Sequence, residues 1–448
     1  MKYEGFEALL RSRAADFAER PALLFAQGGE IGALSYAELL DQVLRRRDEL
    51  KREPFSCAAI YSSFDVDWVV TMFACVLAGK RTVLLDVSQS PEAASALIRY
   101  TEADWLYCSE PDDREALSPS LAAPCKPAQA QEEGRLLFFT SGTTEFNKAV
   151  VLSTRALCSS AWNGQAMLPC RETDVLLAML PPNHVFGFVC SLLWPLSQGA
   201  AVALGRGMRY FTQDPGFFKP NILPAVPSLI KYLCAMKALN PELHTVLIGA
   251  SPCDAQTLQT VRESGVDLRF GYGLTETASG LAISLAGEDP LAMALCPDTQ
   301  LRIAEDGEIL VRTSCMMEGY YKNEAATNAV LKDGELSTGD LGRLDEQGRL
   351  RITGRKKDVL ILENGTKVYL NEWEQSLSAL LNTETAVLLK DGRLTLAAVG
   401  SEDKRELFWE KIRWFNGTQS FDRQIAALML LDEALPRTAT GKLKRWAI

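Results

Sequence analysis

Small hydroxyl side chains, a glycine and a lysine stand together in residues 139–148 (FTSGTTEFNK), at the end of a strand-like run at 135–139. In such a loop, hydroxyl and backbone N–H groups can converge on phosphate oxygens, while the lysine adds a positive charge. The stretch is not a Walker P-loop, because no Gly-Lys-Ser/Thr follows the glycine at the required spacing. It predicts a phosphate-binding loop of another kind, and taken alone it also fits an ordinary Ser/Thr-rich loop.

A second stretch, residues 270–277 (FGYGLTET), places a tyrosine between two glycines and follows it with Thr275 and Glu276. The aromatic ring can stack flat on a nucleotide base, and the threonine hydroxyl can reach a phosphate. The glutamate offers a hard oxygen ligand for Mg²⁺. The pattern indicates nucleotide binding, although a turn with a core tyrosine would contain the same residues.

Three further stretches lie nearer the carboxyl end. Residues 337–340 (STGD) supply a carboxylate suited to a pair of ribose hydroxyls, and residues 354–358 (GRKKD) supply an arginine suited to an oxygen-rich ligand. Residues 435–442 (LPRTATGK) end in a lysine six residues before the last one. Taken alone, the first two also fit exposed turns, and the third fits a solvated basic tail.

Helix-like and strand-like patterns alternate along most of the chain. A capping box at 35–38 (SYAE) opens one helix. The strand-like runs include 57–61, 82–85 and 105–108, and the helical runs 68–77 and 91–100. This alternation predicts helices packed on a largely parallel sheet.

Two regions depart from the alternation. Residues 109–133 are rich in Pro, Ala, Ser and acidic side chains, which predicts a surface connection. Between 301 and 350, Asp-Gly and Gln-Gly turns separate short alternating runs, which is typical of antiparallel hairpins. The residues after 358 could form a small α+β domain.

The composition is that of a soluble globular protein of two or three domains: 448 residues, 47% hydrophobic and 23% charged. A net charge of −10 gives no general attraction for nucleic acid. The eleven cysteines lack metal-ligand spacing and predict buried, reduced thiols. The most apolar stretch, 185–204, is broken by Pro195, so no membrane segment is expected. Without a signal peptide pattern at the amino terminus, a cytoplasmic location is expected.

In this order and at these separations, the stretches resemble the superfamily of acyl-CoA synthetases, peptide-synthetase adenylation domains and firefly-type luciferases. Residues 35–39 (SYAEL) and 319–321 (GYY) extend the resemblance over almost the whole chain. It implies an α/β fold: a large amino-terminal domain, 1–355, of sheets layered with helices plus a small β-barrel-like region. A small mobile α+β domain, 356–448, would rotate on a hinge that Lys357 matches.

The implied activity is AMP-forming activation of a carboxylic acid by ATP with Mg²⁺, followed by acyl transfer to the thiol of coenzyme A. By resemblance, Tyr272 stacks on adenine, Thr275 binds the α-phosphate and Glu276 positions Mg²⁺. Lys442 drives adenylation, and Gly365 borders the thiol channel. The other matched positions hold the β- and γ-phosphates (Thr140, Ser141, Gly142, Thr143, Thr144 and Lys148), line the other side of adenine (Gly249, Ala250 and Ser251) and bind the ribose (Asp340 and Arg355).

Three positions of the phosphate loop depart from the family pattern. Glu145 and Ala149 stand where the family usually has glycine, and Asn147 where proline is common. An extra carboxylate near a triphosphate is unfavourable unless it points outward or meets Mg²⁺. Weakened or adjusted ATP binding is expected, because Lys148 and the hydroxyls remain.

Residues 181–188 (PPNHVFGF) resemble the family's acyl-pocket entrance. Amino-acid-activating members commonly place an aspartate shortly after an aromatic residue here, and none occurs between Phe186 and Leu193. A fatty or aryl acid is therefore favoured over an amino acid. The expected lining consists of His184, Phe186, Cys190, Ser251, Gly271 and Gly280, with a packed histidine as the alternative for His184.

Coenzyme A and a carrier-protein phosphopantetheine present the same thiol. The sequences of 184–187 (HVFG) and 273–277 (GLTET) are most like those of fatty acyl-CoA ligases, which favours coenzyme A as the acceptor. One alternative is a stand-alone adenylation enzyme that loads an acyl carrier protein. Another is a catalytically inactive relative that binds an acyl group or an adenylate, which Glu145 favours.

Overall fold

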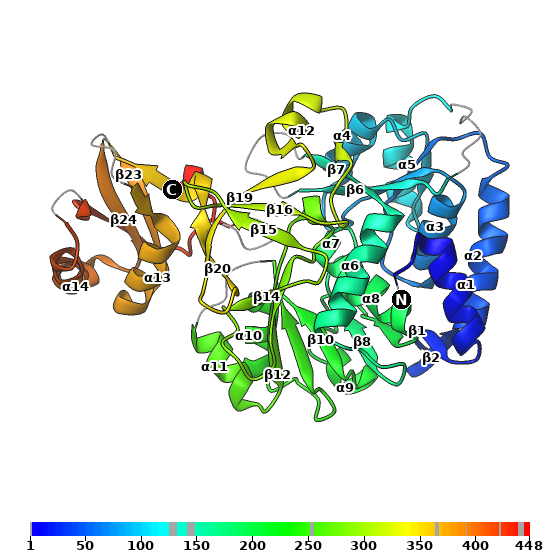
Figure 1. Cartoon of the computed structure of the whole chain (residues 1–448), viewed down its shortest axis with the longest axis horizontal. Helices are drawn as coiled ribbons and strands as arrows, with labels where there is room; N and C mark the ends of the chain where they lie inside the picture. The colour runs from blue at the N-terminus through cyan, green and yellow to red at the C-terminus, as the bar shows by residue number, and fades with distance from the viewer. Residues whose placement is uncertain are drawn as a thin grey trace. The chain divides into compact units, whose positions relative to one another are not determined.

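The computed structural model describes residues 2–124, 132–140, 148–250, 255–362, 367–390, 392–420, 423–437 and 443–448. The chain divides into two compact units (Figure 1). Unit 1 consists of Met1–Gln300 and Arg312–Leu336, and unit 2 of Leu301–Val311 and Ser337–Ile448. The predicted domain boundary at 355/356 falls inside unit 2 and stays a prediction.

One sheet of unit 1 has six strands in the order β17-β7-β6-β4-β3-β5. The strand pairs β3–β4, β3–β5 and β4–β6 are parallel, as the alternating pattern predicted, and β7 runs antiparallel to β6 and β17. The strands are β3 (Cys57–Ile60), β4 (Arg81–Leu84), β5 (Trp105–Tyr107), β6 (Arg135–Phe139), β7 (Ala149–Ser153) and β17 (Gly319–Tyr320).

A second sheet of unit 1 has the order β14-β13-β12-β11-β10-β8-β9-β1-β2. Its centre, from β12 to β1, is parallel, and every residue of β10 and β11 is buried. The strands are β1 (Pro21–Gln27), β2 (Glu30–Ser35), β8 (Val175–Ala178), β9 (Ala201–Leu204), β10 (Ile222–Ala225), β11 (Thr245–Ile248), β12 (Asp267–Tyr272), β13 (Ala282–Ser284) and β14 (Met293–Leu295). Both sheets confirm the predicted α/β class.

Helices cover these sheets, and α1 (Phe6–Phe17), α2 (Tyr36–Leu50) and α3 (Val66–Leu77) lie side by side (Figure 1). The predicted capping box is present: Ser35 Oγ accepts from Glu38 N, and Glu38 Oε2 accepts from Ser35 N. The remaining helices of unit 1 are α4 (Pro91–Thr101), α5 (Pro111–Leu117), α6 (Thr154–Met167), α7 (Val185–Gly187), α8 (Trp194–Gln198), α9 (Asp214–Phe218), α10 (Pro227–Ala235), α11 (Ala255–Glu263) and α12 (Glu324–Val330).

The predicted surface connection at 109–133 is mostly exposed where the structure describes it, but it contains a helix that was not predicted. Helix α5 and a 3₁₀ turn, Ser118–Ser120, form within it. Pro111 occupies the first helical turn, where its missing N–H costs nothing, and Asp112 and Asp113 favour the positive end of the helix. The loop-like composition thus hid a short helix that its proline and acidic residues start.

Unit 2 begins with β15 (Gln300–Ile303), β16 (Glu308–Arg312), β19 (Glu335–Leu344) and β20 (Leu350–Arg355), which lie side by side in that order. The predicted Asp-Gly and Gln-Gly turns at 306–307, 333–334 and 347–348 join β15 to β16, β18 (Leu331–Lys332) to β19, and β19 to β20. This confirms the expected hairpins.

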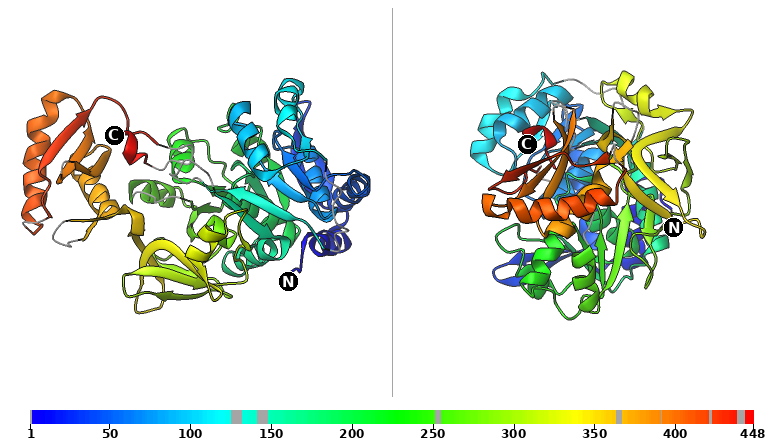
Figure 2. Two further views of the ribbon diagram at one scale, coloured as in Figure 1. Left: turned by 90° about the horizontal axis from the view of Figure 1, so that it is seen from above. Right: turned by 90° about the vertical axis from the view of Figure 1, so that its left-hand side faces the viewer.

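The rest of unit 2 is a small α+β layer. Strands β23 (Thr385–Lys390), β24 (Arg393–Val399) and β25 (Ala427–Leu431) form one sheet, and β21 (Val359–Ile361) pairs with β22 (Lys367–Tyr369). Helices α13 (Leu370–Leu381) and α14 (Arg405–Gly417) pack on one face of the three-stranded sheet, around a core that includes Leu377, Leu396 and Ile412. Figure 2 shows both helices in orange beside these strands.

The cysteines were predicted to be reduced and buried. The nine cysteines of the described segments are free thiols, and seven of them are buried. Within these segments no group of three His, Cys, Asp or Glu side chains could hold a metal ion. No helix in the described part of the chain is long and apolar enough to cross a membrane.

The capping box gives a test of the local argument. Ser35→Ala removes the hydroxyl that accepts from Glu38 N and should lower the free energy of unfolding by about 1 kcal/mol. The urea midpoint of the transition that includes α2, followed by circular dichroism, measures the change. Ser228→Ala, at an exposed position in the first turn of α10, is the control and should leave the midpoint unchanged. Equal midpoints for the two variants would contradict the capping argument.

Candidate active site

The two ends of the predicted phosphate loop lie next to each other. Strands β6 and β7 pair as far as Phe139 and Ala149, and Thr140 N donates to Lys148 O at 3.0 Å. This pairing brings Thr140 and Lys148 together. The loop residues Ser141, Gly142, Thr143, Thr144, Glu145 and Asn147 lie outside the described residues.

Lys148 is held by an aromatic ring. Its Nζ lies 4.6 Å from the centroid of the Tyr320 ring, a cation–π contact. No carboxylate in the described segments lies within ion-pair distance of this amine. Among the described residues, the contact with the ring leaves the N–H donors of Lys148 unused.

Glu276 meets the same tyrosine. It lies in a 3₁₀ turn, Thr275–Thr277, that follows β12, and its carbonyl oxygen accepts from Met317 N at 2.8 Å. Tyr320 Oη donates to Glu276 Oε1 at 2.7 Å. Burial, followed by the neighbouring Glu276 carboxylate, raises the pKa of Tyr320 well above its usual value. In the sequence, residues 319–321 stand out only by their resemblance to the family, and the contacts of Tyr320 with Glu276 and Lys148 become visible only in three dimensions.

The tyrosine predicted to stack on adenine ends β12, where the backbone is tightly constrained. Tyr272 is half-buried, and its carbonyl oxygen accepts from Leu281 N at 3.0 Å. A Cβ atom on Gly273 would lie 1.3 Å from the carbonyl oxygen of Ser279, so only glycine fits there. Ser279 has φ 84°, a left-handed conformation that is costly for a residue with a side chain. Such strain is concentrated at binding sites.

Residues of the predicted acyl pocket and of the predicted adenine wall lie in contact. A Cβ atom on Gly249 would lie 3.0 Å from Cζ of Phe186 and 3.4 Å from the carbonyl oxygen of Gly271. The Phe186 ring therefore rests on the backbone at Gly249. Ala250, next in sequence, is exposed and has φ 69°. Ser251 lies outside the described residues.

The other predicted pocket residues surround a π-helix, Phe188–Leu193. Cys190 lies within it, where burial raises the pKa of its thiol to about 12, opposed by a hydrogen bond with Ser279. A Cβ atom on Gly280 would lie 3.0 Å from Ser160 Oγ. His184 is half-buried at the start of α7, and its N–H donates to Pro181 O at 3.2 Å. The extra residue in a π-helical turn re-aims side chains, and such turns are frequent at functional sites.

In unit 2, the two residues predicted to bind ribose form an ion pair. Arg355 Nε lies 2.8 Å from Asp340 Oδ1 across the β19–β20 pair, and the Asp340 carboxylate is almost fully buried. Gly339, at φ 70°, donates its N–H to Glu308 Oε1 at 3.0 Å. Thr338 Oγ1 accepts from Asp340 N at 3.1 Å. The part of β19 that carries Asp340 is thus held by Glu308 as well as by Arg355.

Ion pairs also hold the residues on either side of Lys357. Lys356 Nζ lies 2.7 Å from Asp306 Oδ2 and 2.8 Å from Glu308 Oε2, and these bonds raise the pKa of Lys356 to about 12. Lys357 itself is exposed and pairs with no carboxylate of the described chain.

Asp358, the residue after Lys357, forms an ion pair with Arg445. Its guanidinium lies 3.2 Å from Asp358 Oδ1 and 2.7 Å from Glu374 Oε2. Burial raises the pKa of Glu374, and the charge of Arg445 opposes this shift. Arg445 therefore connects the residue after Lys357 to helix α13.

The remaining predicted residues, Lys442 and Gly365, lie outside the described residues.

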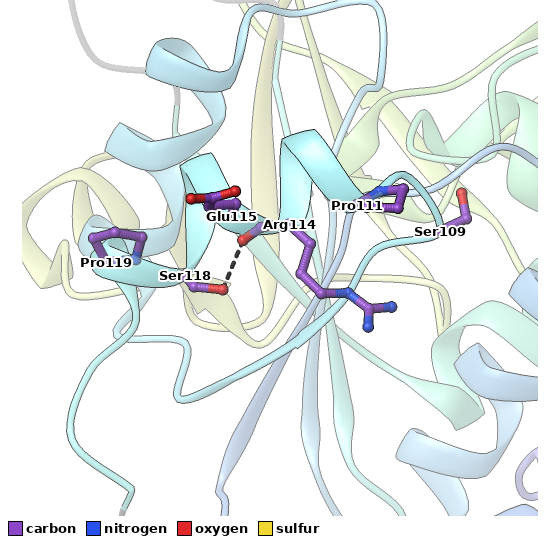
Figure 3. Close-up of a pocket in the computed structure, with 6 residues that line it drawn as sticks. All are labelled: Ser109, Pro111, Arg114, Glu115, Ser118 and Pro119. Carbon is purple, nitrogen blue, oxygen red and sulfur yellow. Dashed lines mark hydrogen bonds between the residues drawn. The ribbon is translucent and has the colours of Figure 1, made fainter.

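A hollow of about 460 Å³ lies beside α5, lined by Ser109, Pro111, Arg114, Glu115, Ser118 and Pro119 (Figure 3). None of the predicted site residues lines it. Arg114 in its wall is engaged, because Nε donates to Cys108 O at 3.1 Å. The hollow is therefore not part of the predicted active site.

A family model described as AMP-binding enzyme matches residues 10–321. The chain belongs to this family. The match confirms the resemblance that the sequence motifs indicated, and it covers the phosphate loop, Tyr272, Glu276 and Tyr320.

The relatives are acid–CoA ligases. The chain is 31% identical over 325 residues to a 2-succinylbenzoate–CoA ligase of Listeria monocytogenes, with 69% of this chain and 68% of the relative covered. It is 25% identical over 431 residues to a long-chain-fatty-acid–CoA ligase of Mycobacterium tuberculosis, with 76% and 72% covered.

Solved structures share the fold over nearly the whole chain. The O-succinylbenzoate coenzyme A synthetase of Bacillus subtilis in complex with AMP has a TM-score of 0.82 at 24% identity, with 98% of this chain and 97% of that chain covered. An anthranilate CoA ligase in complex with anthranoyl-AMP has a TM-score of 0.83 at 19% identity, with 100% and 97% covered.

The ion pairs around Lys357 make a prediction for proteolysis. Arg445→Met removes the partner of Asp358, so the segment 355–358 should open more often and trypsin should cut after Lys356 or Lys357 about fivefold faster. Fragment masses over time under native conditions measure the rate. Arg349→Met breaks an ion pair to Asp345 in the β19–β20 turn and should leave the rate at these lysines unchanged. Equal rates in the two variants would exclude a role of Arg445 in holding the segment.

Proposed function

We propose that this chain is an AMP-forming acid–thiol ligase. It converts a carboxylic acid and ATP into an acyl-adenylate and pyrophosphate, and then transfers the acyl group to the thiol of coenzyme A. The observation that carries the proposal is that Lys148 and Glu276 both contact Tyr320. The shared contact brings a cation at the end of the phosphate loop near a carboxylate suited to a metal ion.

The described residues fit a nucleotide with a metal ion. Lys148 has no carboxylate partner in the described part of the chain. Tyr320 engages Oε1 of Glu276, and no hydrogen bond among the described residues engages Oε2. A lysine with free donors suits the β- and γ-phosphates, and a free carboxylate oxygen suits Mg²⁺. Bound Mg²⁺ would neutralise phosphate charge during pyrophosphate release.

The first chemical step joins two anions. The substrate carboxylate attacks the α-phosphorus of ATP, one P–O bond forms, and the bond to the pyrophosphate oxygen breaks. The Thr275 hydroxyl donates to the α-phosphate, and Lys148 holds the leaving pyrophosphate. Lys442 supplies the positive charge for the oxygen atoms that gain negative charge in the transition state, an interaction that typically accounts for about 10²–10³-fold in rate.

The residues matched by the resemblance to the family account for the recognition of the nucleoside. Tyr272 stacks on adenine, with the backbone of Gly249, Ala250 and Ser251 on the other side. Asp340 accepts hydrogen bonds from the ribose hydroxyls. Its ion pair with Arg355 orients the buried carboxylate, which supports this role.

The acid is an aryl or fatty acid without a charged amino group. The described pocket residues His184, Phe186, Cys190, Gly271 and Gly280 include no carboxylate that would pair with an ammonium group. The burial of the Cys190 thiol, together with the aromatic ring of Phe186 on a glycine backbone, gives an apolar lining. Among the relatives, two act on aryl acids by name, 2-succinylbenzoate and anthranilate, which favours an aryl acid.

Coenzyme A is the acceptor that the relatives' names support. The second half-reaction uses the same acyl pocket after pyrophosphate has left. The thiol then attacks the acyl carbonyl, and AMP departs. A rotation at Lys357 would withdraw Lys442 and admit the thiol. The ion pairs on both sides of Lys357 support a pivot at this residue, because among the described residues Arg355, Lys356 and Asp358 each have an ion-pair partner and Lys357 has none.

Acid-dependent exchange of labelled pyrophosphate into ATP tests the first half-reaction. We expect exchange with aryl or fatty acids and none with amino acids. In Lys442→Ala the exchange should fall by about 10²–10³-fold, while preformed acyl-adenylate still reacts with coenzyme A. Lys444→Ala, two residues further along the same tail, is the control and should retain exchange.

Other results would refute this function. Absence of exchange across fatty, aryl and amino acids, with ATP binding intact, would favour an inactive acyl- or adenylate-binding relative. Exchange without thioester formation from coenzyme A, but with transfer to a phosphopantetheine carrier protein, would identify a carrier-loading enzyme.

A further inference from the structure

Tyr320 contacts two residues that the proposed function assigns to one nucleotide. Its hydroxyl donates to Glu276 Oε1 at 2.7 Å, and its ring lies 4.6 Å from Lys148 Nζ. The three residues come from β17, the 3₁₀ turn after β12, and the end of the loop before β7. A side chain that contacts both ligand-binding groups controls where each of them points.

The hydrogen bond to Glu276 has a defined direction. A phenol O–H donates and a carboxylate oxygen accepts, so at 2.7 Å the hydroxyl of Tyr320 engages one oxygen of Glu276. A carboxylate whose Oε1 accepts this bond has a fixed rotamer, and its Oε2 is left to a hard cation.

The contact with Lys148 fixes the cation without using its donors. The face of an aromatic ring attracts an ammonium group through its quadrupole, whereas a carboxylate partner would take up N–H donors and cancel the charge. Since no carboxylate in the described ranges pairs with Lys148, the ring is the contact that orients it.

The backbone leaves Tyr320 little freedom. Strand β17 pairs Tyr320 with Val150, and Tyr320 N donates to Thr327 Oγ1 at 2.9 Å. Gly319 has φ 152°, and a Cβ atom on it would lie 3.0 Å from the side chain of Thr327. The tyrosine is 8% exposed, so its ring has no alternative position in solvent.

We propose that Tyr320 is a positioning residue that orients the Mg²⁺-binding carboxylate of Glu276 and the phosphate-binding amine of Lys148 for the same nucleotide. The inference rests on the proposed function and adds to it a residue with two separable contacts. The hydroxyl acts on the metal ion, and the ring acts on the phosphates.

The neighbouring Tyr321 provides a matched control. Its hydroxyl also donates to an oxygen, Thr101 O at 3.3 Å, and its ring also carries a cation, with Arg81 Cζ 4.6 Å from the centroid. Neither partner belongs to the proposed nucleotide site. Tyr321→Phe therefore removes a comparable hydroxyl from a comparable environment.

The test measures ATP binding to the full chain by calorimetry, with and without Mg²⁺. In Tyr320→Phe the Mg²⁺ concentration for half-maximal enhancement of ATP binding should rise about tenfold, while ATP binding without Mg²⁺ stays unchanged. Tyr320→Leu, which also removes the ring, should in addition weaken Mg²⁺-free ATP binding about threefold. Tyr321→Phe should match the wild type in both measurements.

The outcomes separate this inference from the proposed function. A Tyr320→Phe chain that is folded by circular dichroism and has the Mg²⁺ dependence of the wild type overturns the positioning role. Equal shifts in Tyr320→Phe and Tyr321→Phe also overturn it, since they indicate a general packing effect. A wild-type chain that binds no ATP overturns the proposed function and the inference together.

Discussion

The short antiparallel pairing of β17 with β7 is the constraint on which the candidate site depends. It aligns Gly319 with Val151 and Tyr320 with Val150, and hydrogen bonds at its ends join Glu318 N to Val151 O and Tyr321 N to Ala149 O. Through it, a residue far along the chain reaches the end of the phosphate loop. This pairing places Tyr320 where it contacts both Lys148 and Glu276.

Two of the predicted ligand-binding groups, Lys148 in unit 1 and Asp340 in unit 2, are held in different ways, and the difference fits the ligands proposed for them. Lys148 is oriented by a ring, a contact worth about 0.5–2 kcal/mol that leaves its charge available for a polyanion. Asp340, by contrast, is ion-paired with Arg355. A ribose is neutral, so a carboxylate that already has a counter-charge can still accept hydroxyl hydrogen bonds through its remaining lone pairs.

Sequence patterns predicted the helices and strands better than the long-range contacts between them. The capping box at Ser35, the parallel strands β3, β4 and β5, and the hairpin turns between 301 and 350 follow from local residue chemistry. Helix α5 was missed because its proline and acidic residues suggested a loop.

The neighbourhood of Tyr320 shows why the candidate site could be predicted only in part. The motifs identified Lys148 and Glu276, but the residue between them depends on a pairing with β7 that no local pattern contains. The contact of Phe186 with Gly249 is likewise long-range. In the sequence, Tyr320 is marked only by its place in 319–321 (GYY), a stretch that resembles the family.

The backbone after Tyr272 shows what such a site costs. Ala278 and Ser279 both have left-handed φ values, 46° and 84°, each of which costs about 1–3 kcal/mol for a residue with a side chain. Gly273 must be glycine because the carbonyl of Ser279 folds back against it. In return, Thr277 Oγ1 accepts from Leu274 N at 3.0 Å, which fixes the turn that carries Thr275 and Glu276. The strained backbone and this hydrogen bond together determine where Thr275 and Glu276 point, which links the cost of the turn to the placement of these two side chains.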